Sequence, residues 1–436
     1  MPPHPLDSPT PAPSATPRSL HRFTLANGLK VYLREDRRVP LVSAQMWYHV
    51  GSSYEPDGHT GLSHALEHVI FEGGSKLAPG QYSALISRLG GEPNAFTNRD
   101  ATVFPVTLPA SRVEIVLEVL ADAMASARFD EAAFTRELDI IKAERRTRLD
   151  STPYALALER ARLLAHGASR YATPIIGHPQ DLEQMTYANV RVWYQSWYHP
   201  NNATLVVVGA ISPERLRVLV ERHFAGLQAN RLPPRETPRE SASLEQRSQT
   251  VAAPGMRPGV IMTFNTPAQA TARTPEVALA LRLLAVVLAV GASSRLYRRL
   301  VRGAKALAVK AEYEYLQRGD GLFIVSAISS GAPEEMASLI WHELEVLRQT
   351  PPEEQELKRA KASLLSAQIF EQDDIAQQAS TIGAYATSGL DPDLPGTEPQ
   401  AIENLTGEHL RQAAHEYFTR RRLAVTYMHD KERSHE

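Results

Sequence analysis

The sequence predicts an α+β protein made of two related domains. In both halves of the 436-residue chain, short apolar stretches typical of strands alternate with amphipathic stretches typical of helices. The two halves also end alike: residues 191–209 and 410–430 each combine a helical stretch with an aromatic end and a short apolar strand. A repeat of about 200 residues indicates a duplicated domain and argues against a short-period solenoid.

Changes in composition mark the expected domain boundaries. Residues 1–19 are rich in Pro, Ser and Thr and are expected to form a disordered lead-in. Residues 227–250 are polar and proline-rich without a periodic apolar face, which is typical of an interdomain linker. The first domain is therefore expected at 20–226 and the second at 251–430.

The overall composition narrows the classes of function. A net charge of −2 gives no electrostatic basis for binding nucleic acid or an anionic membrane. The chain has no cysteine, so a metal would have to be held by His, Asp or Glu. The longest apolar region, residues 277–290, contains Arg282 and is too short to span a bilayer. Because the N-terminus lacks a signal-peptide pattern, a cytoplasmic location is expected, or a periplasmic one if a signal has been removed.

The first half is expected to begin with a β-hairpin. Residues 21–36, HRFTLANGLKVYLRED, alternate apolar and polar side chains around an Asn27-Gly28 turn. Further strand patterns lie in residues 41–52, in 90–109 on both sides of a turn at Asn98–Asp100, and in 203–211. Helical patterns lie in residues 80–89, 111–127, 131–149, 154–166, 181–197 and 213–224.

The second half repeats this alternation after the linker. Strand patterns lie in residues 259–265, 306–315 and 321–329, and again near the C-terminus. Helical patterns lie in residues 275–290, 333–349, 353–371 and 373–388, and in the stretch before the last strand. Both halves therefore predict a sheet packed with helices.

Residues 61–74, GLSHALEHVIFEGG, place three titratable side chains in an apolar helical stretch that Thr60 is expected to cap and Gly73 to end. At 100° per residue, His64 and His68 lie 40° apart on one face, with Glu67 close by. Two imidazoles at this spacing suit one zinc ion, and a neighbouring carboxylate can move a proton. The alternative is that both histidines are ordinary core or surface residues. A zinc site of this kind needs a third protein ligand.

A second helical stretch offers candidates for that ligand. In residues 129–150, Asp130 is expected to cap the helix, with Phe129 and Phe134 forming a hydrophobic staple. Glu137 and Glu144 are seven apart, so they share one face, and the isoleucines between them indicate that this face is partly buried. The alternative is that both glutamates are solvated and pair with nearby arginines.

Together these motifs resemble the M16 metallopeptidases, the group of pitrilysin, insulin-degrading enzyme and mitochondrial processing peptidase, and most of all its short two-domain bacterial branch. The resemblance covers residues 20 to 430. It rests on the motifs already described and on GGEPNAFTNRDATVF, YHPNNATLVVVG and GASSRLYRRLV. It implies mostly antiparallel sheets, each packed with helices, in two domains that form half of a clamshell chamber.

The resemblance also implies the chemistry. His64, His68 and Glu144 would bind one zinc ion per chain, Glu67 would be the general base acting on a metal-activated water, and Glu137 would hold a ligand histidine. The implied activity is that of a zinc metalloendopeptidase or oligopeptidase that hydrolyses unfolded or short peptides.

The stretch Asn94-Ala95-Phe96-Thr97 resembles the edge strand on which the family binds its substrates. A peptide added there as a β-strand would be held by main-chain hydrogen bonds, which tolerate many sequences. The alternative is that these residues form an ordinary core strand.

One stretch departs from the family pattern. Many members supply an Arg and a Tyr, seven apart, from the second domain to the bound peptide; here Arg302 is present but Val309 stands at the tyrosine position. Valine cannot donate a hydrogen bond to an oxyanion. The resemblance therefore implies a heterodimer with a homologous, zinc-less subunit that supplies the Arg–Tyr pair, with a homodimer as the alternative.

Two other functions stay open from the sequence. Some members of the family are non-catalytic structural or assembly subunits, although such a subunit has no need of His64, Glu67, His68 and Glu144 together. A dedicated maturase that processes one precursor would have the same residues as a general peptidase.

Overall fold

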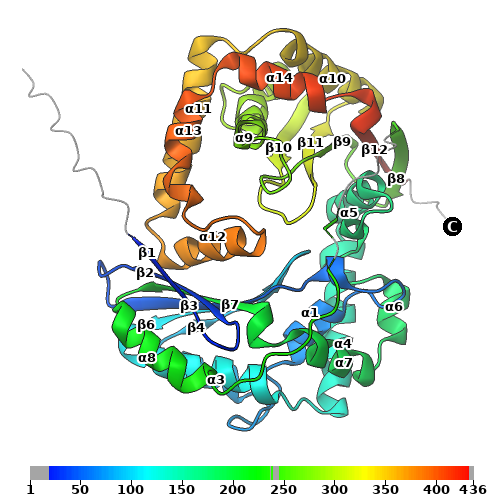
Figure 1. The fold of residues 1–436 in the computed structure, drawn as a ribbon. Helices are drawn as coiled ribbons and strands as arrows, with labels where there is room; N and C mark the ends of the chain where they lie inside the picture. Colours follow the sequence, from blue (N-terminus) through cyan, green and yellow to red (C-terminus); the bar gives the residue numbers. More distant parts are fainter. Residues whose placement is uncertain (1–18, 236, 239–244, 432–436) are drawn as a thin grey trace, which may run out of the picture.

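The computed structural model describes residues 19–235, 237–238 and 245–431. Of the expected lead-in, 1–19, only Ser19 belongs to the described residues. The chain forms two lobes, each built on one β-sheet (Figure 1). No helix in the described part of the chain combines the length and the apolar character needed to cross a membrane.

The first lobe is built on a seven-stranded sheet in the order β1-β2-β7-β3-β6-β4, with β5 also paired to β6. The strands are β1 Leu20–Thr24, β2 Lys30–Glu35, β3 Leu41–Tyr48, β4 Glu92–Pro93, β5 Phe96–Thr97, β6 Thr102–Pro109 and β7 Ala203–Gly209. All pairs are antiparallel except β2 with β7. The predicted hairpin turn is present. Gly28 has a φ of 90°, a left-handed backbone conformation that favours glycine.

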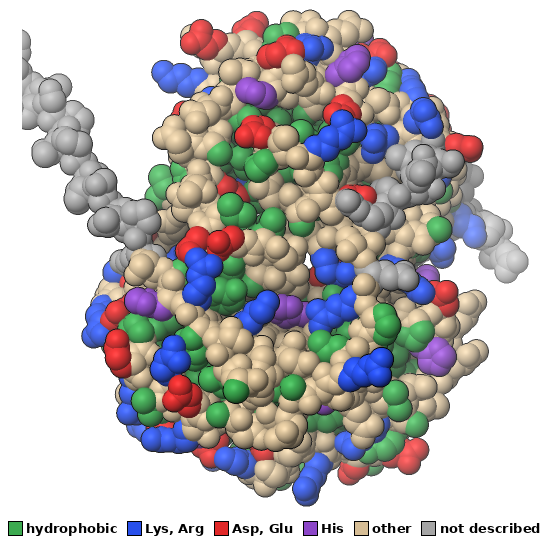
Figure 2. Space-filling view, viewed as in Figure 1, with side chains coloured by type: hydrophobic (Ala, Val, Ile, Leu, Met, Phe, Trp, Pro, Cys, Tyr) green, Lys and Arg blue, Asp and Glu red, His purple; other side chains and the backbone are tan. Residues whose placement is uncertain are grey.

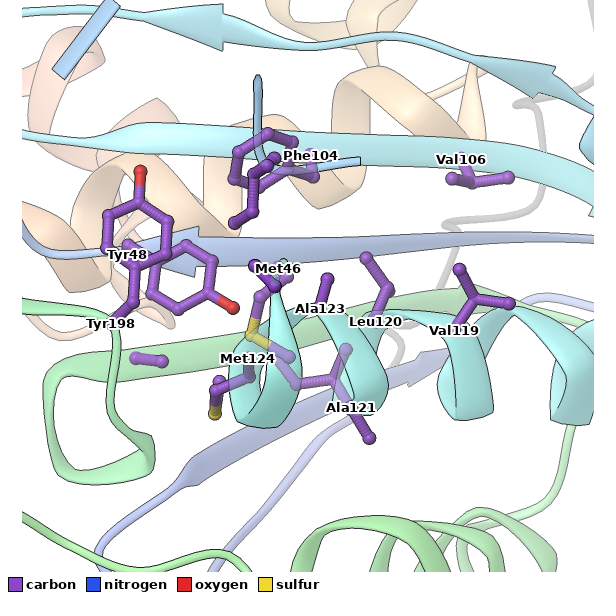
Figure 3. Close-up of a cluster of buried hydrophobic side chains, with 14 of the residues drawn as sticks. Met46, Tyr48, Phe104, Val106, Val119, Leu120, Ala121, Ala123, Met124 and Tyr198 are labelled. Carbon is purple, nitrogen blue, oxygen red and sulfur yellow. The ribbon is translucent and has the colours of Figure 1, made fainter. Parts of the chain in front are cut away.

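Helices cover this sheet and build the right-hand side of the lobe in Figure 1. They are α1 Leu62–Val69, α2 Gln81–Arg88, α3 Val113–Ser126, α4 Glu131–Arg145, α6 Pro179–Gln184, α7 Tyr187–Trp197 and α8 Pro213–Phe224. In Figure 3, Leu120 and Ala123 of α3 point towards the strands that carry Met46 and Phe104. These side chains are buried in one hydrophobic cluster, which fixes α3 on the sheet.

Two helices of the first lobe differ from the prediction. The helix expected at 181–197 is two helices, α6 and α7, because Thr186 breaks the helix and caps α7 through a capping box with Asn189. The helix expected at 131–149 ends as an α-helix at Arg145 and continues as a π-helical turn, Arg146–Asp150.

The second lobe is built on a five-stranded sheet in the order β10-β11-β9-β12-β8. The strands are β8 Arg247–Ala253, β9 Gly259–Thr266, β10 Ala306–Tyr313, β11 Gly321–Ser329 and β12 Leu423–Asp430. The helices of this lobe are α9 Pro275–Ala289, α10 Pro333–Gln349, α11 Glu354–Glu371, α13 Glu398–Asn404 and α14 Gly407–Tyr417. β8 begins inside the stretch expected to be linker, 227–250. As a half-exposed edge strand it lacks the apolar run by which strands are recognised.

The two lobes exchange one helix each. α5, Pro153–His166, follows the first lobe in sequence but packs on the second sheet, where Ala157 and Ala161 contact the cluster around Ile261. α12, Ile375–Thr387, packs on the first sheet, with Ile382 in one cluster with Trp47. Figure 1 shows both helices at the junction of the lobes. The structural units are therefore not the contiguous segments 20–226 and 251–430.

Candidate metal centre and active site

The N-terminus of α1 is held by a buried carboxylate. Glu55 accepts hydrogen bonds of 2.7 Å from the backbone N–H groups of Gly61 and Ser63. Thr60, the expected N-cap, instead donates its hydroxyl to Asp181 at 2.5 Å. The expectation for Thr60 was wrong because a side chain distant in sequence satisfies the free N–H groups of the first turn.

α1 and α4 bring His64, His68 and Glu144 together. Oε2 of Glu144 lies 3.7 Å from Nε2 of His64 and 3.6 Å from Nε2 of His68. Among the described residues these three form the one group of His, Asp or Glu side chains close enough to share a metal ion. Tetrahedral zinc places its ligand atoms about 3.3 Å apart, so this donor set fits zinc with little movement.

Glu137 lies where a supporting residue is needed. Its Oε2 is 3.1 Å from Nδ1 of His68, which leaves Nε2 directed at the metal position. The predicted cap of α4 is present, since Asp130 accepts a hydrogen bond from Ala133. The face between the glutamates is buried only in part: Ile141 is buried, whereas Ile140 is 51% exposed.

The alternative partner of Glu144 is present as well. Oε1 of Glu144 forms an ion pair with Arg148 at 2.7 Å, while Oε2 faces the imidazoles. One carboxylate therefore serves both contacts. Arg148 and Arg145 were the partners expected under this alternative; Arg148, at i+4 from Glu144, is the one that pairs with it.

Glu67 lies between the histidines and the edge strand. Its Oε2 accepts a hydrogen bond of 2.6 Å from the hydroxyl of Thr97. Burial raises the pKa of Glu67 above its usual range, and the bond from Thr97 opposes that rise. Burial, together with His68 and Arg148, lowers the pKa of His64 to about 3, so this imidazole is neutral at physiological pH, as a metal ligand must be.

A cavity of about 590 Å³ opens in front of these residues. Its lining includes apolar side chains such as Leu158, Leu163 and Ile176 and the arginines Arg99 and Arg162. Figure 2 shows this face of the molecule hollowed between the lobes, with Lys and Arg side chains along the hollow. The cavity is large enough for several residues of an extended peptide.

The expected substrate-binding stretch borders this cavity. Asn94, Ala95 and Phe96 all line it, and β5 pairs with β6 on one side only. The ring of Phe96 also packs edge-on against Trp47, so this side chain contributes to the core as well. Arg302 does not line this cavity: it follows the turn Tyr297–Val301 in the second lobe and is exposed.

Contacts from the second lobe reach the loop after β5, and no pattern in the sequence indicated them. Arg99 pairs with Glu314 of the second lobe at 3.3 Å. Asp100 accepts hydrogen bonds from Tyr171 at 2.6 Å and from the backbone N–H of Arg318 at 3.0 Å. The loop after β5 is therefore held by both lobes.

Family models match most of the chain. The model described as insulinase, peptidase family M16, matches residues 30–170, and the model described as peptidase M16 inactive domain matches residues 184–364. The first match contains His64, His68 and Glu144, and the second match contains none of these three residues.

Curated relatives and solved structures agree with these matches. A zinc protease of Helicobacter pylori, PqqE, is 29% identical over 47% of this chain, but the match spans only 46% of that protein. An uncharacterized zinc protease of Mycobacterium bovis is 28% identical over 98% of this chain and 97% of its own length. A crystal structure of a protease from Helicobacter pylori superposes with a TM-score of 0.88 at 25% identity, covering 94% of this chain and 100% of that chain. The relatives' names support a metallopeptidase, and the chain belongs to the M16 peptidase family.

Proposed function

We propose that this chain is a zinc-dependent endopeptidase or oligopeptidase that hydrolyses unfolded or short peptides. The observation that carries the proposal is the convergence of three side chains able to bind a metal, His64, His68 and Glu144, beside the partly buried carboxylate of Glu67. Zinc bound there would supply a Lewis acid and activate water at neutral pH.

Glu67 is the proton carrier in this proposal. Its carboxylate accepts the proton of the attacking water and later donates it to the leaving amine. Burial raises the pKa of Glu67, which makes it a stronger base than an exposed glutamate. Thr97 fixes one oxygen of this carboxylate, and Glu137 holds the ring of His68 in place.

The substrate binds as an extended strand beside β5. The free edge of β5 borders the cavity, so a peptide there can add to the sheet through main-chain hydrogen bonds. Asn94, Ala95 and Phe96 supply the nearest contacts. A folded protein does not offer such an unpaired strand, so unfolded or short peptides are the expected substrates.

The complete enzyme is proposed to be a heterodimer. Val309 stands where many family members have a tyrosine, and Arg302 lies outside the cavity of its own chain. A homologous, zinc-less partner would supply the missing Arg–Tyr pair to this cavity; a homodimer is the alternative.

The test of catalysis separates metal binding from turnover. The full-length chain is purified and its zinc content is measured beside that of the variants Glu67→Gln and His64→Ala. We expect one zinc per chain in the wild type and in Glu67→Gln, and loss of zinc in His64→Ala. Hydrolysis of unstructured peptides should be lost in both variants; residual turnover by Glu67→Gln near the wild-type rate refutes the assigned role.

The test of assembly uses purification from the native host. We expect a second M16-like chain to co-purify and peptide hydrolysis to rise when it is added back to the isolated chain. If the isolated chain cleaves peptides as fast as any complex does, the heterodimer is wrong.

A further inference from the structure

A second pocket lies on the other side of the general base. It has a volume of about 350 Å³ and shares Glu67, His68, Asn94 and Ala95 with the large cavity. The two hollows therefore meet at the position where a peptide bond would be cleaved. We refer to the smaller one as the α1–α2 pocket, because Glu72 and Tyr82, from the segment after α1 and from α2, complete its wall.

The floor of the α1–α2 pocket is aromatic and rigid. Phe71 and Tyr82 stack with ring centroids 3.7 Å apart and an angle of 4° between the rings. Phe71 is also held edge-on by the buried Phe104. A flat aromatic surface of this kind packs against the long aliphatic stem of Arg or Lys and attracts its cationic head.

The charge in this pocket is negative. Glu67 and Glu72 are among its lining residues, and none of the described residues that line it is Lys or Arg. The large cavity differs, since the arginines Arg99, Arg148 and Arg162 line it besides the glutamates Glu67, Glu144 and Glu159. Among the described residues, a basic side chain therefore meets arginines in the large cavity and none in the α1–α2 pocket.

Glu72 has one charged neighbour outside the pocket. Arg136 of α4 approaches Oε2 of Glu72 at 3.4 Å, but Arg136 is 59% exposed and Glu72 is 22% exposed. A contact of this length at the surface binds weakly and is readily exchanged for a better partner. Glu72 is therefore able to form an ion pair with a ligand in the pocket.

The direction of the substrate follows from the sheet. β4 and β5 both pair antiparallel with β6, and a peptide added in the same way runs antiparallel to β5. Going along the chain, Pro93 borders the α1–α2 pocket and Arg99 borders the large cavity. An antiparallel peptide therefore enters from the large cavity and places the residue after the scissile bond in the α1–α2 pocket.

We infer that the α1–α2 pocket is a specificity subsite for a basic side chain, Arg or Lys, immediately C-terminal to the scissile bond, with Glu72 as the selecting residue. This inference rests on the proposed peptidase function and names its substrate class. Phe71 and Tyr82 hold the aliphatic stem, and Glu72 pairs with the charged head.

A binding experiment tests the subsite without turnover. The zinc-loaded Glu67→Gln chain, with its partner where one co-purifies, is titrated with two peptides that differ only in Arg or its neutral isostere citrulline after the expected cleavage position. We expect the Arg peptide to bind about tenfold more tightly. Adding Glu72→Gln should abolish the difference. The matched control Glu92→Gln changes a neighbouring carboxylate that does not line the pocket and should preserve the difference.

A peptide-library digest by the wild-type protein completes the test and separates two kinds of failure. Enrichment of Arg and Lys directly after the cleaved bond, lost in Glu72→Gln, supports the subsite. Cleavage without that enrichment overturns it while leaving the peptidase in place. If no peptide is cleaved but the Arg peptide still binds more tightly through Glu72, the subsite stands and the proposed hydrolase fails. Equal binding of both peptides overturns the subsite whatever the digest shows.

Discussion

Thr97 joins strand β5 to Glu67, the proposed general base. Its hydroxyl donates to Glu67 at 2.6 Å while its backbone belongs to β5. We predict that Thr97→Val lowers kcat/KM about tenfold, because a hydrogen bond to a charged group contributes about 1.5 kcal/mol. Thr97→Ser keeps the hydroxyl and should retain most activity. Full activity in Thr97→Val together with loss in Thr97→Ser would show that the methyl group, and not the hydrogen bond, matters.

Glu137 is expected to act on metal affinity. It contacts Nδ1 of His68 at 3.1 Å, so it fixes the ring that presents Nε2. Glu137→Gln should weaken zinc binding about 10- to 100-fold, measured by competition with a chelator. Glu131→Gln, an exposed glutamate in the first turn of the same helix, is the matched control and should leave the affinity unchanged.

The sequence predicted those site residues whose placement depends on local geometry. His64 and His68 share a face because of helical spacing. Asp130 caps α4 because the N–H group that it accepts from, that of Ala133, lies only three residues away. The hydrogen bond from Thr97 to Glu67 and the cap from Glu55 were missed because each depends on a contact between separate segments. A single sequence does not specify such contacts without a template.

At the scale of elements, a partly buried ion cluster ties the loop after β5 to the second lobe. Glu314 lies directly after β10, and its Oε1 is 3.3 Å from both Arg99 and Arg162. Burial acts to raise the pKa of Glu314, but the two arginines outweigh it and hold the pKa at about 2. The loop after β5, helix α5 and strand β10 are therefore joined by one carboxylate.

This cluster predicts a pH dependence of stability. The pKa of Glu314 is lower in the folded protein than in the unfolded chain, so its contribution is complete above about pH 4.5 and is lost as the pH falls towards 2. A difference of this size corresponds to about 3 kcal/mol. Glu314→Gln should lower the free energy of unfolding at pH 7 by about that amount, with a deficit that shrinks at acid pH, measured by urea unfolding.

Glu312 provides the control for this prediction. It lies two residues earlier on the same strand and pairs with Lys310 at the surface. Glu312→Gln should change stability by less than about 0.5 kcal/mol at any pH. A constant deficit for Glu314→Gln from pH 7 to pH 2 would mean that packing, and not charge, explains its effect.

Elements were predictable to the extent that their pattern is local. Long helices such as α9 and α10 and buried strands such as β7 and β11 were predicted because their apolar periodicity is strong. The start of β8 was assigned to the linker because its exposed positions alternate with half-buried positions that are only weakly apolar. Short helices such as α13 carry too few residues for a period to be recognised.

At the scale of the molecule, the exchange of α5 and α12 determines how the lobes are joined. Each sheet is covered in part by a helix from the other half of the chain. Periodicity predicts that α12 has an apolar face, but it does not predict which sheet that face covers. Contiguous domains were therefore the natural expectation, and the exchange is visible only in three dimensions.

Gly383 of α12 lies directly against the side chain of Trp47 on the first sheet. A Cβ atom added there would lie 2.1 to 2.5 Å from the indole ring of Trp47, which is itself buried. In an exposed helix, Gly→Ala stabilises by about 1 kcal/mol. Here the rigid ring has no room to move, so Gly383→Ala should instead destabilise the protein by about 1–3 kcal/mol.

The measurement also tests whether the lobes unfold together. Because α5 and α12 each bury side chains in the opposite lobe, loosening one of them exposes core on both sides, and we expect Gly383→Ala to lower the midpoint of a single calorimetric transition. Gly331→Ala, where no atom lies within 4 Å of the new methyl group, is the control and should leave the midpoint in place. Two separated transitions, of which Gly383→Ala shifts only one, would show instead that the lobes are independent and that the exchanged helices couple them weakly.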